Sequence, residues 1–268
     1  MSRSGVTSPH PDIRVEQDGH VTTVTIDRPA AKNACTGDMW VALGEIFRAV
    51  GYSGTRAVVL TGAGDDFCAG ADLAGSGTGG PSSEGGGLDA MRVLSDAVVG
   101  VHGCPVPVIA KVDGVCVGAG FGLALACDLL WCSERARFCV IYAKRGLSLD
   151  FGTSWLLRQR IGVHRAKELA FTAEMIDAER ALEIGFVNAV VPAASLDQVT
   201  TEMATTIAAG PPLALSMSKR QLDNAGSTSL VQALEVEALA QNVNMGTDDL
   251  REALTAWIER RPPEFRGR

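Results

Sequence analysis

Three glycines at alternate positions, Gly118, Gly120 and Gly122, constrain this chain more than any other feature. They follow residues 106–112, a short stretch rich in β-branched side chains that predicts a buried strand. They open an apolar run that ends before Asp128 and predicts a buried helix. Each glycine inside a helix costs about 1 kcal/mol relative to alanine. We therefore expect another backbone or a ligand to approach the amide groups at the start of this helix.

Two simpler interpretations of these glycines stand beside this one. Small residues also let a helix pack tightly against a strand with no ligand involved. A dinucleotide-binding loop is disfavoured, because the spacing is Gly-Ala-Gly-Phe-Gly rather than Gly-x-Gly-x-x-Gly. In addition, no acidic residue follows at the distance that such a loop requires. The choice between these interpretations depends on a second motif.

This second motif lies earlier in the chain, at residues 67–73, and reads Phe-Cys-Ala-Gly-Ala-Asp-Leu. It follows a strand-like stretch at residues 56–61 and is named here the Ala71 motif. The triple-glycine motif, residues 113–122, reads Asp-Gly-Val-Cys-Val-Gly-Ala-Gly-Phe-Gly. Together and in this order, the two motifs resemble those of the crotonase family, also called the enoyl-CoA hydratase/isomerase family. The resemblance extends from about residue 13 to residue 265.

The resemblance implies an α/β fold, a crotonase-like spiral of ββα units with a C-terminal helical region. Residues 12–195 are then expected to form the ββα core with the CoA and acyl sites. Residues 196–268 are expected to form a helical region that covers the site and serves oligomerisation. Since the family builds trimers, often paired into hexamers, we expect a homotrimer or a homohexamer. The expected partner is an acyl-CoA thioester, with coenzyme A as part of the substrate and no separate cofactor.

Local patterns predict the individual elements. An Asp18-Gly19 turn predicts a hairpin over residues 13–26, and Pro211-Pro212 predicts the start of a helix. Residues 75–87 contain so many glycines that we expect a mobile loop, which leaves one wall of the acyl pocket undefined. Periodicity predicts helices over 38–50, 88–102, 165–172 and 178–184, strands over 129–133 and 186–191, and mostly helix after residue 196.

Backbone amides are the expected centre of the chemistry. Negative charge that develops on a thioester oxygen is stabilised by fixed hydrogen-bond donors aimed at that oxygen. By resemblance, the amides of Ala71 and Ala119 form this oxyanion hole, and the positive end of the helix that starts near Gly118 adds to it. The alternative role for both alanines is packing.

Further residues are assigned to substrate and CoA binding by the same resemblance. They are Arg28, Lys32, Ala69, Asp72, Leu73, Gly118 and Tyr142. Among them, Asp72 is expected to hold the oxyanion loop rather than to touch the substrate. Arg28 and Lys32 are candidates for contacts with the CoA nucleotide, and the alternative for both is solvated surface charge.

The acid–base residues depart from the family pattern. Hydratases of the family use two glutamates, and the corresponding positions here hold Gly122 and Tyr142. The chain therefore lacks the pair of carboxylates that positions water and moves its proton. We expect Tyr142 to line the acyl pocket, although its phenol can also donate a hydrogen bond.

One carboxylate remains in this region, Asp150. It lies where some isomerases of the family carry a catalytic aspartate, and its neighbours Leu149 and Phe151 are apolar. Desolvation by such neighbours raises the pKa of a carboxyl and suits it to taking and returning a proton. Alternatively, Asp150 caps a helix that begins at residue 151 or 152, a role compatible with catalysis.

Four functions remain open at this point. The leading hypothesis is an isomerase in which Asp150 moves a proton between carbons of a CoA-bound enolate. The second is a hydratase with atypical acid–base residues. The third uses Asp150 as a nucleophile, as dehalogenases of the family do, but Ser95 stands where these enzymes have a histidine. The fourth is a non-catalytic acyl-CoA-binding protein.

Composition excludes several other classes. A net charge of -7 disfavours nucleic acid as a partner. The longest uncharged run, residues 114–127, is too short to span a membrane, and residues 1–11 lack the apolar region of a signal peptide. The seven cysteines include no Cys-x-x-Cys pair and there are four histidines, so we expect no metal site. Cysteines in apolar contexts suggest reduced thiols and a cytoplasmic location.

Overall fold

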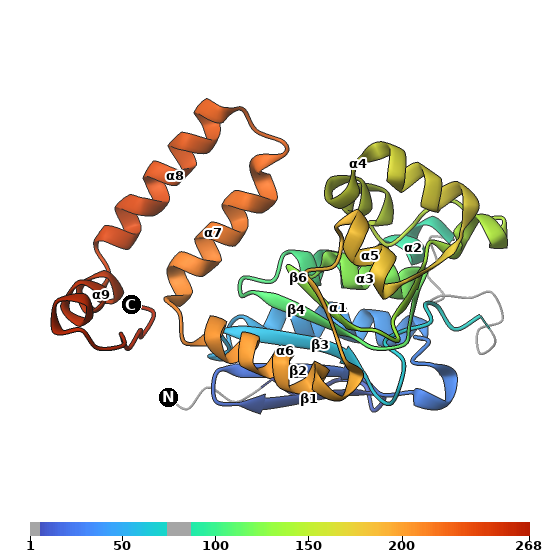
Figure 1. Cartoon of the computed structure of the whole chain (residues 1–268), viewed down its shortest axis with the longest axis horizontal. Coiled ribbons are helices and arrows are strands. Elements are labelled where there is room, and N and C mark those ends of the chain that lie inside the picture. The colour runs from blue at the N-terminus through green and yellow to red at the C-terminus, as the bar shows by residue number, and fades with distance from the viewer. Residues whose placement is uncertain (1–5, 74–86) are drawn as a thin grey trace.

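A six-stranded sheet forms the base of the molecule, with helices on both of its faces (Figure 1). The computed structural model describes residues 6–73 and 87–268. The strand order is β1(Ile13–Asp18), β2(Val21–Ile26), β3(Ala57–Gly62), β4(Val108–Val112), β6(Leu129–Ser133) and β9(Ala189–Val191). β1 and β2 pair antiparallel, and the other pairs in this sheet are parallel.

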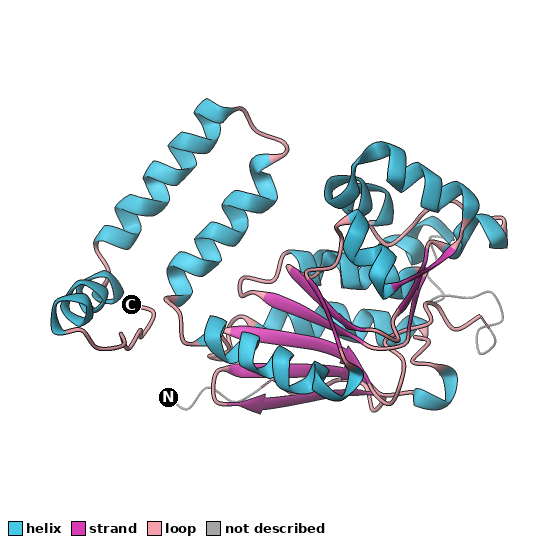
Figure 2. Ribbon diagram, viewed as in Figure 1, coloured by secondary structure: helices cyan, strands magenta, loops and turns pink. Residues whose placement is uncertain are grey.

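A smaller three-stranded sheet lies next to it and carries part of the site (Figure 2). Its order is β5(Val115–Val117), β7(Arg137–Cys139) and β8(Met175–Asp177). β5 is short because Gly118 follows it with a φ of 57° and turns the chain into a helix.

The helices follow in chain order. They are α1(Gly37–Val50), α2(Gly87–His102), α3(Ala119–Ala126), α4(Thr153–Thr172), α5(Ala178–Ile184), α6(Ala193–Ala208), α7(Pro212–Ala225), α8(Leu230–Met245) and α9(Asp248–Glu259). Two short 3₁₀ helices, η1(Pro29–Ala31) and η2(Ile141–Arg145), complete the described elements. No helix within residues 6–73 and 87–268 is long and apolar enough to cross a membrane.

The larger sheet is buried on both faces, which explains its nearly continuous apolar strands. In β3, Val58 and Leu60 point into the main core, which also contains residues of α1, α2 and α3. Ala57 and Val59 point to the opposite face, where α6 covers them. Alternate residues of one strand therefore serve two cores.

The helices α7, α8 and α9 form an arm that stands away from the body, as the orange and red ribbons of Figure 1 show. The boundary expected at residue 195 lies inside α6, which still packs on the sheet. Midway along α7, Lys219 is buried, and its Nζ lies 2.8 Å from Oδ2 of Asp128. This ion pair ties the arm to the end of α3.

Most of the local predictions are confirmed. The hairpin, the helices at α1, α2 and α5, the strand at β6 and the helix that follows Pro211 lie where they were expected. The helix predicted over residues 165–172 is the second part of α4, and the first part, which begins at Thr153, was not predicted. Gly162 interrupts α4 with a φ of 77° and divides the apolar pattern into two segments. The loop expected at residues 75–87 lies outside the described residues, apart from Gly87.

Candidate functional site

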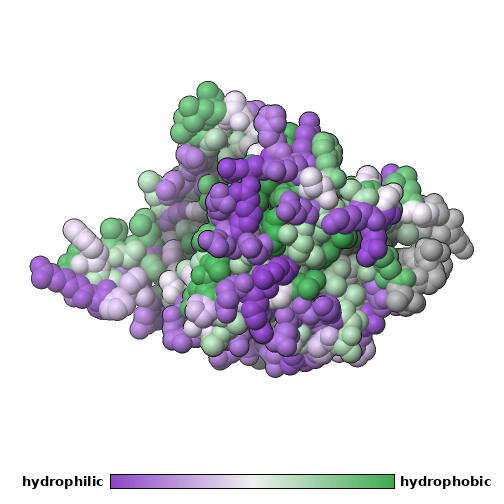
Figure 3. Space-filling model, turned by 45° about the vertical axis from the view of Figure 1, so that its right-hand side comes forward, coloured by the Kyte–Doolittle hydropathy of each residue, from purple (hydrophilic) through white to green (hydrophobic). Residues whose placement is uncertain are grey.

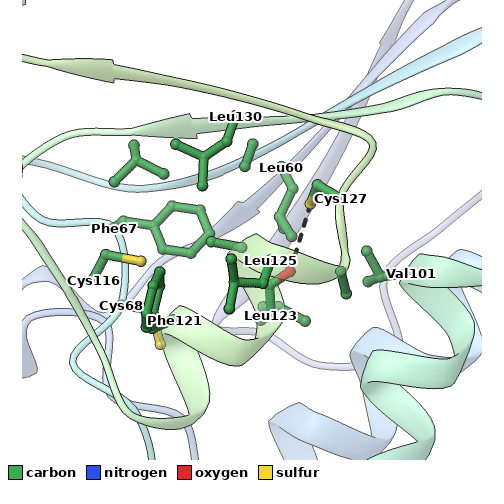
Figure 4. Packing of buried hydrophobic residues seen from close by; sticks show 14 of the residues in the cluster. Leu60, Phe67, Cys68, Val101, Cys116, Phe121, Leu123, Leu125, Cys127 and Leu130 are labelled. Carbon is green, nitrogen blue, oxygen red and sulfur yellow. Dashed lines mark hydrogen bonds between the residues drawn. The ribbon is translucent and has the colours of Figure 1, made fainter. Parts of the chain in front are cut away.

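The Ala71 motif and the triple-glycine motif lie side by side. Cys68 N donates to Val115 O at 2.9 Å, and Val117 N donates to Cys68 O at 3.0 Å. Figure 4 shows Phe67 and Cys68 packed together with Cys116 and Phe121 in the core. Two segments far apart in the sequence thus form one buried junction beside the start of α3.

Gly70 allows a close approach of two backbone segments at this junction. Its φ is 99°, and a Cβ atom at this position would lie 2.9 Å from Val117 O and 3.5 Å from Ala119 N. Any side chain here would therefore collide with the turn that enters α3. The close backbone approach expected from the glycines is confirmed, since Gly120 likewise lies against Cys68.

The amides of Ala71 and Ala119 are available for a ligand. Within residues 6–73 and 87–268, neither N–H donates a hydrogen bond to the protein. Ala119 is the first residue of α3, so its amide also carries the positive end of the helix dipole. A donor at a helix N-terminus and a second donor in the neighbouring loop are suited to hold an oxygen that gains negative charge.

Arg28 and Asp72 stabilise the loop that carries Ala71. Nη1 of Arg28 lies 3.0 Å from Oδ2 of Asp72 and 2.6 Å from Ala34 O. The Asp72 amide donates to Cys35 O at 2.9 Å, which adds a backbone bond to the ion pair. The guanidinium of Arg28 is therefore engaged within the chain, and Asp72 contacts both Arg28 and Cys35.

Lys32 and Leu73 border the same loop. Lys32 O accepts a hydrogen bond from Ala69 N at 3.0 Å, and the side chain of Lys32 is exposed. Leu73 is 68% exposed. Asn33, which the sequence analysis did not single out, is buried and joins the loops through bonds from its Nδ2 to Ala63 O and Asp66 O. Its φ is 56°, a left-handed conformation that asparagine tolerates better than most residues. The asparagine itself was therefore the signal in the sequence, and it was missed.

The loop that carries Asp150 packs against α3 at Gly122. A Cβ atom on Gly122 would lie 2.6 Å from Phe151 O and 3.0 Å from Oγ1 of Thr153. The space next to α3 that a side chain would need at residue 122 is thus filled by this loop. Phe151 adopts a φ of 47°, and its ring lies 4.7 Å from that of Trp40.

Asp150 does not cap α4, so that alternative was wrong. The N-cap is Gly152, which has a φ of 68° and no side-chain cap, and α4 begins at Thr153. Oδ1 of Asp150 is buried and has no hydrogen-bond partner among the described residues. Burial raises the pKa of this carboxyl, and a hydrogen bond from Tyr142 partly opposes the shift.

Tyr142 is buried at 4% exposure and faces the same loop. Its hydroxyl lies 3.5 Å from Asp150 O and 3.5 Å from Oγ1 of Thr153. Burial, together with the nearby Asp150 charge, raises the pKa of the phenol, which therefore stays protonated. The third residue of this cluster, Thr153, was not singled out in the sequence, because its role depends on the turn that precedes α4.

Comparison with known proteins places this geometry in a family. The family model described as enoyl-CoA hydratase/isomerase matches residues 16–268. A short-chain-enoyl-CoA hydratase from Clostridium acetobutylicum is 35% identical over 272 residues, covering 96% of this chain and 98% of the relative. The 1,2-epoxyphenylacetyl-CoA isomerase of Escherichia coli is 33% identical over 251 residues, covering 92% of this chain and 95% of the relative.

Solved structures agree with this assignment. The crystal structure of an enoyl-CoA hydratase from Bacillus anthracis matches with a TM-score of 0.89 and 32% identity, covering 96% of this chain and 100% of that chain. The expected α/β fold of the crotonase type is thereby confirmed. The chain belongs to the enoyl-CoA hydratase/isomerase family.

Proposed function

We propose that this protein is an acyl-CoA isomerase in which Asp150 moves a proton between carbon atoms of a CoA-bound enolate. The observation that carries the proposal is the contrast between two positions beside α3. Gly122 has no room for the side chain of an acid, whereas Asp150, in the loop that packs against Gly122, has a buried carboxyl oxygen without a hydrogen-bond partner among the described residues. A single carboxyl suits a proton shuttle better than it suits the addition of water.

The oxyanion hole of the proposed reaction consists of the Ala71 and Ala119 amides. Removal of an α-proton from a thioester places negative charge on its oxygen, and two fixed donors stabilise that charge. The N-terminus of α3 contributes in the same direction, since Ala119 is its first residue.

Asp150 acts first as a base and then as an acid. Its raised pKa brings the carboxyl closer to the pH at which it can both remove and return a proton. Because Oδ1 has no hydrogen-bond partner among residues 6–73 and 87–268, it is the oxygen assigned to the substrate proton.

Substrate binding is assigned to residues that border the Ala71 motif. Arg28 is already engaged by Asp72, so the exposed Lys32 is the first candidate for the phosphates of CoA. Ala69, Leu73 and Gly118 lie along the same loops and are assigned to the acyl and pantetheine portions. No cofactor is proposed beyond the CoA that belongs to the substrate.

Hydration is the second candidate function, because the relatives in the family include both kinds of enzyme. One relative is named a hydratase and another an isomerase. A hydratase of this chain would have to add water with Asp150 alone, since Gly122 and Tyr142 provide no carboxylate. A non-catalytic acyl-CoA-binding protein is the third candidate.

The test is the conversion of a 3-enoyl-CoA to the conjugated 2-enoyl-CoA, followed by ultraviolet absorbance. We expect turnover by the natural protein and a loss of about 10²- to 10⁴-fold for Asp150→Asn, the usual contribution of a general base. Asp18→Asn is the matched control, because Asp18 is an exposed residue at the end of β1.

Each other outcome has a definite meaning. Full activity of Asp150→Asn would overturn the role of Asp150. If the protein leaves the 3-enoyl-CoA unchanged but removes the absorbance of a 2-enoyl-CoA supplied in its place, hydration replaces isomerisation as the function. If neither reaction occurs while CoA thioesters still bind, the protein is a binding protein.

We also propose that the protein is a homo-oligomer, a homotrimer or homohexamer. Every residue of α8, all of which the structure describes, stays exposed or half-buried within one chain, although many of them are apolar. A helix of this kind needs a partner surface.

A further inference from the structure

We infer that Arg160 is a positioning residue whose charge, held at the C-terminal end of α3, strengthens the oxyanion hole at the other end of that helix. This role rests on the proposed function, in which the Ala119 amide binds the thioester oxygen. Arg160 belongs to α4 and acts on the reaction only through α3. The sequence motifs gave it no role.

Two hydrogen bonds place the guanidinium of Arg160 at the C-terminal end of α3. Its Nη2 lies 2.5 Å from Leu125 O and 2.7 Å from Cys127 O. α3 ends at Ala126, and Cys127 is its C-cap. The last carbonyls of a helix have no partner within the helix and carry the negative end of its dipole. Arg160 therefore holds a positive charge directly against that negative end.

Burial makes this charge effective. All eight residues of α3 are buried, so water screens the two ends of the helix poorly. Burial also lowers the pKa of the Arg160 guanidinium, and the neighbouring Cys127, Asp128 and Asp223 oppose this shift. An arginine nevertheless stays charged at every pH at which an enzyme works. The positive charge at the end of α3 is thus permanent.

The alternative role of Arg160 is a cap that only satisfies two carbonyls. A neutral amide would satisfy the same carbonyls without the free-energy cost of burying a charge. Both acceptors of Nη2 are carbonyls, whereas the nearby carboxylate of Asp128 is bonded to other donors. Its Oδ2 accepts from Lys219 Nζ at 2.8 Å and from Val108 N at 2.7 Å. The charge of Arg160 therefore acts chiefly on the helix.

The short length of α3 connects its two ends electrostatically. Eight residues make a helix of about 12 Å, so the negative end lies close enough to weaken the positive end at Ala119. A cation at the negative end removes this opposition. One unit charge at a distance of roughly 15 Å changes an equilibrium about 5-fold at an effective dielectric constant of about 20. The enolate oxygen carries more negative charge than the thioester oxygen, so the reaction gains more than binding does.

The first test separates the charge of Arg160 from its hydrogen bonds. Arg160→Gln removes the charge and keeps an amide that can donate to the carbonyls. We expect kcat for the 3-enoyl-CoA to fall about 5-fold, with KM changed less. Arg160→Lys keeps the charge and should retain most of the activity. Arg158→Gln is the matched control, because it makes the same charge change at an exposed position of α4, where water screens the charge.

A second measurement needs no turnover. Donors in an oxyanion hole polarise the thioester carbonyl, which lowers its stretching frequency in the infrared. Butyryl-CoA labelled with carbon-13 at this carbonyl should therefore show a lower frequency when bound, with a smaller shift in Arg160→Gln and a natural shift in Arg160→Lys. Asp223→Asn, at a half-buried position of α7, removes a negative charge that acts on Arg160 and should increase the shift. This isosteric variant keeps the test valid if Arg160→Gln fails to fold.

The two measurements distinguish failure of this role from failure of the proposed function. A natural protein that converts no 3-enoyl-CoA would overturn the isomerase, and the infrared band would still report on Arg160. The same band in the natural protein, Arg160→Gln and Asp223→Asn would overturn the role of Arg160. Equal losses in Arg160→Gln and Arg160→Lys would do the same, since they would reduce Arg160 to a cap. A bound thioester whose band does not shift in the natural protein would overturn both, because no oxyanion hole would act on it.

Discussion

At the scale of single residues, Asp150 illustrates a conflict between stability and the proposed chemistry. Its carboxyl is half-buried, and burial raises its pKa in the folded protein. The folded state therefore favours the protonated form more than the unfolded state does. The resulting contribution to the free energy of unfolding is fully present below the pKa of an unfolded aspartate. It is lost as the pH rises through the raised pKa.

We expect Asp150→Asn to remove this loss of stability at higher pH. The amide is neutral at every pH, so the variant should be more stable than the natural protein near neutral pH, by less than about 1 kcal/mol after allowance for solvent screening. The difference should shrink as the pH falls toward the ordinary pKa of aspartate. Urea unfolding at a series of pH values measures it. A difference that is independent of pH would contradict this account.

Residue positions were predictable from sequence only where a backbone motif encodes them. The glycines of the two motifs placed the Ala71 and Ala119 amides together, because close approach at Gly70 requires glycine. The contact between Tyr142 and Asp150 was not predictable. It depends on a φ of 47° at Phe151, a conformation that no local preference of phenylalanine indicates.

At the scale of elements, the packing of α3 against the loop before α4 decides what residue 122 can be. Alanine is better than glycine by about 1 kcal/mol in an open helix. Here the added Cβ would lie 2.6 Å from Phe151 O, a backbone atom that cannot rotate away. Overpacking of this kind typically costs about 1–3 kcal/mol and outweighs the helix preference.

We therefore expect Gly122→Ala to lower the free energy of unfolding by about 1–3 kcal/mol in urea titrations. Gly87→Ala is the matched control, since no neighbouring atom of the described residues lies within 4 Å of a Cβ at that helical position. The same collision faces Gly122→Glu, so replacing the glycine with the family glutamate should not create a hydratase. Unchanged or increased stability of Gly122→Ala would show that the loop moves aside.

The elements themselves were predictable where each of them has one apolar face. α1 buries Met39, Leu43, Ile46 and Phe47 on such a face, and its expected limits were correct within one residue. α4 was predicted only in its second half, because Gly162 breaks the periodicity. Strand β9 is shorter than expected, since its residues pair only from Ala189 onward.

At the scale of the whole molecule, the arm of α7, α8 and α9 exposes many large apolar side chains within one chain. Leu230 and Val231, at the start of α8, are 75% and 77% exposed, and apolar surface is visible at the top of Figure 3. A hollow of about 440 Å³ lies between the three helices and is lined by residues such as Met217 and Leu250. Contiguous apolar surface of this kind marks an interface.

We expect the natural protein to have a mass of three or six times 28.0 kDa in size-exclusion chromatography with light scattering. Leu239 is 61% exposed on α8, and a charge there opposes burial against a second copy. Leu239→Glu should therefore shift the mass toward that of one chain. Leu182→Glu, the same change at a leucine on α5 that is 44% exposed, should leave the mass unchanged. A monomeric natural protein, or an unaltered assembly of Leu239→Glu, would show that α8 is covered in another way.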